Sequence, residues 1–255
     1  MEAARLAIAI PQRSADAGLR MQAIAFDLGD TLVEYAGLPP SWAQYYGEAL
    51  TALAGHLGVT PHPGQIGRGS AVLRSYNTRL HPREREVSFA TILAELLPCF
   101  GVTKAVDELA CARAFFDVFR KRLRCFDDVK PALEGLKARG QKLGVFTDAA
   151  YGMPREFIIE DIQLAGLDGF FPAIFTSVDV GFRKPAAETL QRLARELGSK
   201  PRDLIHVGNE EKDVLAAKAA GCRSVVIDRN DQRPSWGQDR TIKSLLELWV
   251  ERAWF

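Results

Sequence analysis

The alternation of apolar and polar stretches along the chain predicts an α/β protein. The apolar run Ala23–Phe26 is short and is followed by polar residues, as is typical of a buried strand. It ends at Asp27, and Gly29 and Thr31 follow in a turn-prone stretch. Open parallel sheets bind their ligands at the carboxyl ends of their strands. Asp27 is therefore a candidate functional residue, although a strand that simply ends in an Asp- and Gly-rich turn explains the same stretch.

The next part of the chain, residues 36–124, has the spacing of amphipathic helices. Apolar and aromatic side chains recur at helical intervals after Pro39, and further helical stretches are expected around Phe89–Leu97 and Val106–Phe119. No segment of this block has a convincing strand pattern. Because the block interrupts an α/β pattern that resumes later, we interpret it as a mostly helical cap domain inserted into a core domain.

From Asp127 onward, helix and strand patterns alternate. This rhythm predicts five strands in all, parallel and joined by right-handed crossovers, in a three-layer Rossmann-like α/β core. The predicted helices are Val129–Arg139, Pro154–Leu164, Ala187–Leu197 and Asp213–Ala220. The predicted strands after the first are Lys142–Phe146, Ala173–Thr176, Leu204–Val207 and Ser224–Ile227. A final amphipathic segment, Ile242–Val250, is expected to pack on the outside.

These patterns divide the chain into three parts. Residues 21–35 and 125–255 are predicted to form the core domain, and residues 36–124 the cap domain. Residues 1–20 are expected to be an N-terminal extension. Their apolar run is too short, and is interrupted too soon, to be a typical secretory signal. The segment after it is polar and turn-prone.

Composition narrows the classes of function. The 255 residues are 47% apolar, which is enough for a sizeable core. The 33 Lys and Arg side chains balance 32 Asp and Glu, and a net charge of +1 indicates neither nucleic acid nor an anionic membrane as a partner. No apolar run approaches the roughly 20 residues that span a bilayer. We therefore expect a small-molecule partner, and the sequence leaves the oligomeric state open.

The four cysteines are scattered singly, with no Cys-x-x-Cys pair. This pattern argues against a structural zinc site and against a disulfide framework. A reducing, cytoplasmic setting is the expectation that follows.

Polar residues follow the ends of several predicted strands. Thr147 and Asp148 come after the second strand, and Asn209 and Asp213 after the fourth, while Lys184 lies beyond the third. The carboxyl ends of parallel strands converge on one crevice, so these side chains are expected to meet although they are far apart in sequence. A fixed cation near a nucleophilic carboxylate would balance the negative charge of such a site.

Together these residues resemble the four signature motifs of the haloacid dehalogenase (HAD) superfamily, most of whose members are Mg²⁺-dependent phosphohydrolases. The family's motifs correspond in order to Asp27–Thr31, Thr147, Lys184–Pro185 and the segment from Gly208 to Asp213. The resemblance covers residues 21–228, and the helical insertion is similar to the family's first type of cap. Each motif alone would be weak, but their order and spacing agree.

The resemblance implies a phosphatase that forms an aspartyl-phosphate on Asp27. In that reading, Asp27 attacks phosphorus, Thr147 and a backbone amide hold the phosphoryl oxygens, and Lys184 neutralises charge. Thr147, Asp148 and Lys184 form the expected substrate-binding set. The simpler alternatives are that Thr147 caps a helix and that Lys184 is a surface cation.

The resemblance also implies a Mg²⁺ cofactor. Its expected ligands are Asp27, the carbonyl of Gly29, Asn209 and Asp213. Asn209 stands where the family has an Asp, so the site has lost one charged ligand and its Mg²⁺ affinity should fall. Glu210 and Glu211 are possible substitutes, although their pattern favours a solvated, charged turn.

A second departure lies in the first motif. Gly29 replaces the family's second Asp, which is the general acid and base. General acid catalysis contributes about 10²- to 10⁴-fold in rate, so turnover should be slow, least so for good leaving groups. The neighbouring Asp30 could stand in for the missing acid, or it could bond local amides as turn residues do.

These departures leave alternatives open. The chain could be a catalytically weak binding or regulatory protein, or a dehalogenase or phosphonate hydrolase, because some HAD branches lack the second Asp. The cap carries a basic run of Arg79, His81, Arg83 and Arg85 that could recognise an anionic substrate or form a solvated face. The aromatic residues Tyr35, Trp42, Tyr45 and Tyr46 could line a cleft, but their helical spacing favours the core of the cap.

Overall fold

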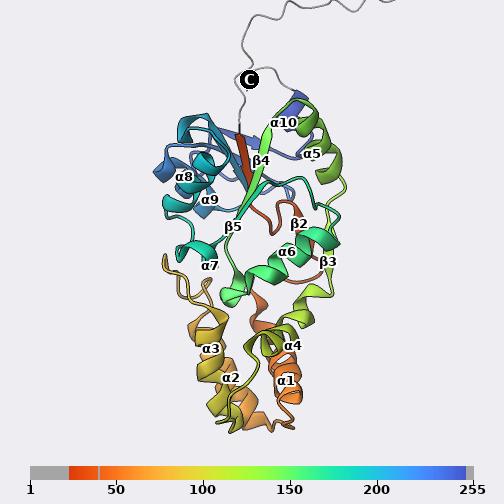
Figure 1. Ribbon diagram of the computed structural model, residues 1–255, viewed down its shortest axis with the longest axis vertical. Coiled ribbons are helices and arrows are strands. Elements are labelled where there is room, and N and C mark those ends of the chain that lie inside the picture. The colour runs from red at the N-terminus through yellow and green to blue at the C-terminus, as the bar shows by residue number, and fades with distance from the viewer. Residues whose placement is uncertain (1–22, 40, 251–255) are drawn as a thin grey trace, which may run out of the picture.

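The computed structural model describes residues 23–39 and 41–250 of the chain. Its centre is a six-stranded sheet (Figure 1). The strands are β1 (Ala23–Phe26), β4 (Lys142–Thr147), β5 (Ala173–Thr176), β6 (Leu204–Gly208), β7 (Arg223–Ile227) and β8 (Arg240–Ile242). They are all parallel and lie in the order β5-β4-β1-β6-β7-β8. The predicted three-layer parallel α/β core is confirmed.

The sixth strand, β8, is absent from the sequence-based prediction of five. It lies at the sheet edge, pairs only with β7, and buries Ile242 while Thr241 stays exposed. So short a segment carries little periodicity. The predicted final segment, Ile242–Val250, is therefore divided between two elements. Ile242 ends β8, and a short helix, α10 (Glu247–Val250), follows.

Strand β1 lies between β4 and β6 at the middle of the sheet, and both faces of it are buried. Ile24 and Phe26 pack into one apolar cluster, whereas Ala23 and Ala25 pack into the other. Phe26 is in register with Val145 of β4 and with Val207 of β6. The carboxyl ends of three adjacent strands therefore lie level with one another.

Helices cover both faces of the sheet (Figure 1). The helices of the core are α5 (Val129–Ala138), α6 (Arg155–Leu164), α7 (Ser177–Val180), α8 (Glu188–Glu196) and α9 (Glu211–Ala220), with the 3-10 turns η3 (Ala150–Gly152) and η4 (Pro201–Asp203). The apolar sides of α5 and α6 share the cluster of Ile24 and Phe26. The apolar sides of α8 and α9 pack on Ala23 and Ala25, small residues that let these helices approach the sheet closely.

A second group of helices, the cap, lies apart from the sheet at the lower end of Figure 1. It contains η1 (Trp42–Tyr45), α1 (Tyr46–His56), α2 (Pro63–Ser75), α3 (Phe89–Leu96), η2 (Leu97–Phe100) and α4 (Glu108–Arg120). Helix α2 is missing from the sequence-based prediction because its glycines hide the pattern. A capping box at its start helps to form it, and Gly69 allows close packing, since a Cβ there would lie 3.0 Å from Leu50.

Two short strands connect the cap with the core. β2 (Val33–Tyr35) pairs antiparallel with β3 (Leu123–Cys125), so both crossings of the chain run side by side. The expectation that residues 36–124 contain no strand is wrong at their last two residues, which belong to β3. The division of the chain into core and cap at residues 35 and 125 stays our interpretation.

The predicted extension, residues 1–20, lies outside the described residues. All four cysteines are free thiols, as their spacing predicts. Within the described ranges, none of the helices has both the length and the apolar character needed to cross a membrane.

Candidate active site

The predicted site residues meet at the carboxyl edge of the sheet, as strand topology requires. Asp27 follows β1, Thr147 ends β4, and Asn209 follows β6. Lys184 reaches the same place from the loop after α7. The simpler alternative of a surface cation is wrong for Lys184, because its side chain is completely buried.

Lys184 joins two carboxylates. Its Nζ donates to Asp27 Oδ1 at 2.5 Å and to Asp213 Oδ1 at 2.6 Å. Burial alone would lower the pKa of Lys184, but the two carboxylates outweigh it and raise the pKa. Burial raises the pKa of Asp27, and Lys184 opposes that rise. The lysine is thus a permanent cation that orients the candidate nucleophile and favours its charged form, although burial still raises the pKa of Asp27 to about 7.

Asp213 is the best-satisfied carboxylate of the site. Its Oδ2 accepts from the backbone amides of Asn209 at 3.1 Å and Glu210 at 2.9 Å. Its Oδ1 accepts from Lys184 and lies 3.3 Å from His206 Nε2. Burial would raise the pKa of Asp213, but Lys184 holds it well below the usual range. With both oxygens engaged, Asp213 supports a role in positioning Lys184 better than one as a direct metal ligand.

Gly208 makes this arrangement possible. A Cβ at Gly208 would lie 2.2 Å from Cγ of Asp213, a distance that real structures do not show. The Asp213 carboxylate therefore occupies the space of a missing side chain. This close approach is the physical reason for a glycine at the end of β6.

Asp148 braces the loop that carries Lys184. Its Oδ1 accepts from the backbone amide of Lys184 at 3.0 Å, and its Oδ2 pairs with Lys212 at 3.2 Å. Burial would raise the pKa of Asp148, but Arg183 and Lys212 outweigh it and lower the pKa. An anionic side chain so engaged is poorly suited to bind phosphate directly. The expectation that Asp148 contributes to substrate binding stays a prediction.

With Asp213 occupied by Lys184 and backbone amides, the other three expected metal ligands provide one carboxylate, from Asp27, and two neutral oxygens, from Gly29 and Asn209. Asp27 Oδ2 accepts no hydrogen bond from the described part of the chain, and Asn209 Oδ1 accepts only a long one, from Thr31 Oγ1 at 3.4 Å. Nowhere among residues 23–39 and 41–250 do three His, Cys, Asp or Glu side chains form a metal-binding group. A hard cation that keeps several waters and also binds substrate phosphate needs only one or two carboxylates. The donors present therefore fit Mg²⁺, although weakly.

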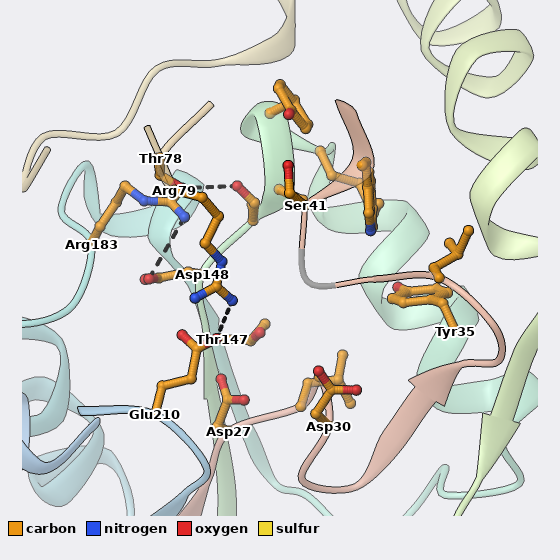
Figure 2. A pocket seen from close by; sticks show the side chains of 18 of the residues that line it. Asp27, Asp30, Tyr35, Ser41, Thr78, Arg79, Thr147, Asp148, Arg183 and Glu210 are labelled. Carbon is orange, nitrogen blue, oxygen red and sulfur yellow. Dashed lines mark hydrogen bonds and ion pairs between the residues drawn. The ribbon is translucent and has the colours of Figure 1, made fainter. Parts of the chain in front are cut away.

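The loop after β1 keeps room for a side chain at Gly29. A Cβ placed there would meet no heavy atom within 4 Å. Asp30 has a left-handed backbone with φ of 55°, which is uncommon for a residue other than glycine, and its side chain points into the cavity (Figure 2). The Asp30 residue as a whole is exposed, but partial burial of its carboxyl group, followed by Glu210 and Glu34, raises its pKa. Whether Asp30 replaces the missing acid stays a prediction.

Two adjoining cavities lie between the core and the cap. The one that contains Asp27 and Thr147 has a volume of about 170 Å³. The other, of about 400 Å³, reaches Lys184 and shares Arg79, Arg183 and Lys212 with the first. Arg79 is the member of the predicted basic run that reaches over Asp27 (Figure 2).

The segment of the cap before α3 packs beside Lys184. Arg85 forms an antiparallel bridge with Phe182, and the backbone amide of Arg183 donates to the Glu84 carbonyl at 2.6 Å. The buried guanidinium of Arg183 pairs with the buried carboxylate of Glu86. Sequence reasoning missed Arg183 and Glu86. Arg183 stands next to Lys184 in the third motif, and that position was the one available signal.

The aromatic residues divide between the two expected roles. Trp42 and Tyr35 line the smaller cavity, and Trp42 also stacks on Phe119 at 4.2 Å. Tyr46 is buried within the cap. The prediction of cap core therefore holds for Tyr46, while Trp42 serves both purposes.

Comparison with known proteins decides the family. A family model described as haloacid dehalogenase-like hydrolase matches residues 21–221. The chain belongs to the haloacid dehalogenase-like hydrolases. The resemblance in the four motifs is thereby confirmed, and with it the prediction of an enzyme of this family.

Relatives of this HAD hydrolase include phosphatases. It is 29% identical over 216 residues to the phosphoglycolate phosphatase of Escherichia coli (strain K12), and 30% identical over 216 residues to that of Salmonella typhi, with 80% of each chain covered in both cases. Two solved structures with the same fold are a HAD phosphatase from Thermococcus onnurineus and a 2-haloacid dehalogenase from Pseudomonas syringae pv. Tomato DC3000. Their TM-scores are 0.63 and 0.60, at 23% and 22% identity, covering 89% of this chain and 96% of each of theirs.

Proposed function

We propose that this HAD hydrolase is a Mg²⁺-dependent phosphatase that removes phosphate from a small metabolite through an aspartyl-phosphate on Asp27. The observation that carries the proposal is the Asp27 carboxylate, held by a buried cation at the base of a small cavity. Phosphatases among the relatives support the same reaction.

The chemistry divides into two displacements at phosphorus. Asp27 Oδ2 attacks the phosphoryl group, and the ester oxygen leaves with the alcohol part of the substrate. A water molecule then attacks the phosphorus of the acyl phosphate, which releases inorganic phosphate and restores the Asp27 carboxylate. Thr147 and the backbone after it would hold the phosphoryl oxygens, and Lys184 would offset their charge. Asp213 would act through Lys184, which it orients.

Three groups would hold Mg²⁺: the carboxylate oxygen of Asp27 that does not attack phosphorus, the Gly29 carbonyl and Asn209 Oδ1. When bound, the ion would supply positive charge next to the transferring phosphoryl group. With Asn209 in place of a carboxylate, Asp27 is the one strong ligand. We therefore expect the site to bind Mg²⁺ weakly and to need millimolar concentrations of the ion. Glu210 is less suited as a substitute because it pairs with Arg79 and Lys212.

Activity should be modest because Gly29 provides no proton donor. The leaving alcohol then takes its proton from water or from another group, and esters with good leaving groups should react fastest. The cavity of about 170 Å³ above Asp27 favours a small phosphorylated metabolite. Phosphoglycolate is the first compound to test, and the free cysteines support a cytoplasmic setting.

The test is phosphate release from a panel of esters with and without chelator. We expect release with Mg²⁺, its loss on chelation, and a fall of at least about 10³-fold in Asp27→Asn, because the nucleophile is gone. Asp168→Asn, in an exposed turn of the core, is the matched control. Release that is absent, or that survives in Asp27→Asn, would falsify the aspartyl-phosphate mechanism.

Two other functions can be tested with the same purified protein. Gly29 and Asn209 together favour a catalytically weak binding protein as the second candidate, which would bind its partner equally well after Asp27→Asn. Chloride release from 2-haloacids without metal would instead indicate a dehalogenase.

A further inference from the structure

The four members of the basic run in the cap are engaged in different ways. His81 is exposed, and Arg85 lies over an aromatic ring of the core at 5.3 Å. Arg83 donates to a backbone carbonyl of its own segment at 2.8 Å. Arg79 alone of the four points over the catalytic carboxylate, and there it pairs with Glu210 of the core (Figure 2).

The backbone of Arg79 is held by the buried side chain of Asn77. The Arg79 backbone amide donates to Asn77 Oδ1 at 2.9 Å. The amide nitrogen of Asn77 in turn donates to Ser41 Oγ at 3.1 Å and to the Tyr46 hydroxyl at 3.0 Å. The cap thus holds Arg79 at one position above the cavity, which is how a recognition residue must be held.

Arg79 is also the lining cation whose partner can most easily change. The other cations around the two cavities each contact at least two protein groups, and they are Arg83, Arg183, Lys184 and Lys212. Among the described residues, Arg79 has one ion-pair partner, Glu210, and its side chain is 43% exposed. An incoming anion can therefore reach it.

Glu210 can release Arg79 without becoming an unpaired charge. Its second oxygen lies 2.9 Å from Lys212 Nζ. Burial would raise the pKa of Glu210, but Lys212 and then Arg79 outweigh it and lower the pKa. When Arg79 turns to another anion, Lys212 still balances Glu210, so the exchange leaves no buried charge without a partner.

We propose that Arg79 is the specificity-determining residue of this phosphatase, and that it binds a carboxylate of the substrate in the place that Glu210 holds when no substrate is present. The inference rests on the proposed function. A guanidinium pairs with a planar carboxylate through two parallel hydrogen bonds, and its present partner is a carboxylate. The preferred substrate is then a phosphorylated hydroxy acid, not the corresponding phosphorylated alcohol.

Two compounds of similar size test this. Phosphoglycolate and 2-hydroxyethyl phosphate share a skeleton, and they differ in a carboxylate against a hydroxymethyl group. The readout is the ratio of their kcat/KM values in the wild type, Arg79→Gln, Arg79→Lys and Arg74→Gln. Arg74 is an exposed residue at the end of α2 and is the matched control.

We expect Arg79→Gln to lower the ratio by about 10- to 100-fold, mainly through the KM of phosphoglycolate, since a charged hydrogen-bonded pair is lost. Arg79→Lys should recover part of the ratio, and Arg74→Gln should not change it. If Arg79 served only to hold the cap, Arg79→Gln would reduce the kcat/KM values of both substrates equally. An unchanged ratio in Arg79→Gln therefore overturns the proposal, even where both rates fall.

A binding measurement separates this inference from the proposed function. Calorimetry with the Asp27→Asn protein gives the Kd ratio of the same two compounds without turnover, before and after Arg79→Gln is added. If the wild type hydrolyses neither compound but the Kd ratio depends on Arg79, the phosphatase proposal fails and the inference stands. If hydrolysis occurs and neither ratio depends on Arg79, the inference fails and the phosphatase stands. Binding of neither compound overturns the inference.

Discussion

The cap meets the core at two junctions that are built differently. At the hinge, where the chain itself crosses, Asp161 of α6 accepts from Arg120 Nε at 2.8 Å and from the Tyr35 hydroxyl at 2.7 Å. Both charged side chains are almost completely buried. At the far side, the loop before α3 contacts the core without a covalent link, through the ion pair between Glu86 of the loop and Arg183 of the core. We call the first group the hinge cluster and the second the loop contact.

The difference lies in what each junction shares with the chemistry. The Asp161 and Arg120 side chains of the hinge cluster line neither cavity, so its charges serve the position of the cap. In the loop contact, Arg183 adjoins Lys184 and lies 3.6 Å from Asp148, which braces the same lysine. The loop contact therefore adjoins Lys184 directly. The two junctions predict separable effects on stability and on turnover.

The largest effect on stability is expected from Asp161→Asn in the hinge cluster. It removes the fully buried counter-charge of Arg120, whose other two carboxylate partners, Glu160 and Asp117, are more exposed. We expect this to cost about 3 kcal/mol in the free energy of unfolding. Urea unfolding measures the loss, with Asp168→Asn as the control for the same change at an exposed position. A loss below about 1 kcal/mol would show that the hinge cluster does not hold the cap.

Glu86→Gln in the loop contact should affect both properties. Hydrogen bonds to a charged group are lost, at about 2–3 kcal/mol of stability. Because Arg183 then loses its nearest buried counter-charge and is held less firmly beside Lys184, kcat/KM should also fall by about 10-fold or more. Urea unfolding and steady-state kinetics measure the two, with the exposed Glu48→Gln as control. A stability loss with unchanged kinetics would make the two junctions alike.

Gly29→Asp changes the site and leaves both junctions intact. The open space at Gly29 admits the side chain, so the free energy of unfolding should change little. A restored proton donor should raise kcat on esters with poor leaving groups by about 10-fold. Gly29→Asn, of equal size but with no such proton, is the matched control. Equal rates in both variants would count against a missing acid as the limit on turnover.

The smallest effect is expected from Tyr35→Phe. One hydrogen bond to Asp161 is lost while Arg120 stays in place, so stability should fall by about 1 kcal/mol. In Tyr45→Phe, the control, the hydroxyl loses only a 3.5 Å contact with the Gly37 carbonyl. Combined with Asp161→Asn, the change should cost less than the sum, because both act on one carboxylate. Full additivity would contradict a single hinge cluster.

The sequence predicted the elements that have strong local patterns. The buried run of β1 and the helices α5, α6, α8 and α9 were found within two residues of their bounds, because each buries one regular face. Helix α2 and strand β8 were missed. A glycine-rich helix and a three-residue edge strand are stabilised mainly by packing against neighbouring elements. Such packing produces no periodic pattern of apolar residues in the sequence.

By itself, the sequence determined the fold class, the family and the group of residues that would meet beside Asp27, since each follows a strand of one parallel sheet. The tertiary structure decided how they are used. Asp213 is engaged by four hydrogen-bonding groups, and Arg79 is directed over the cavity although nothing in its basic run distinguishes it. Partners of a charged side chain depend on contacts between segments more than a hundred residues apart, as between Arg79 and Glu210, and only folding makes those contacts.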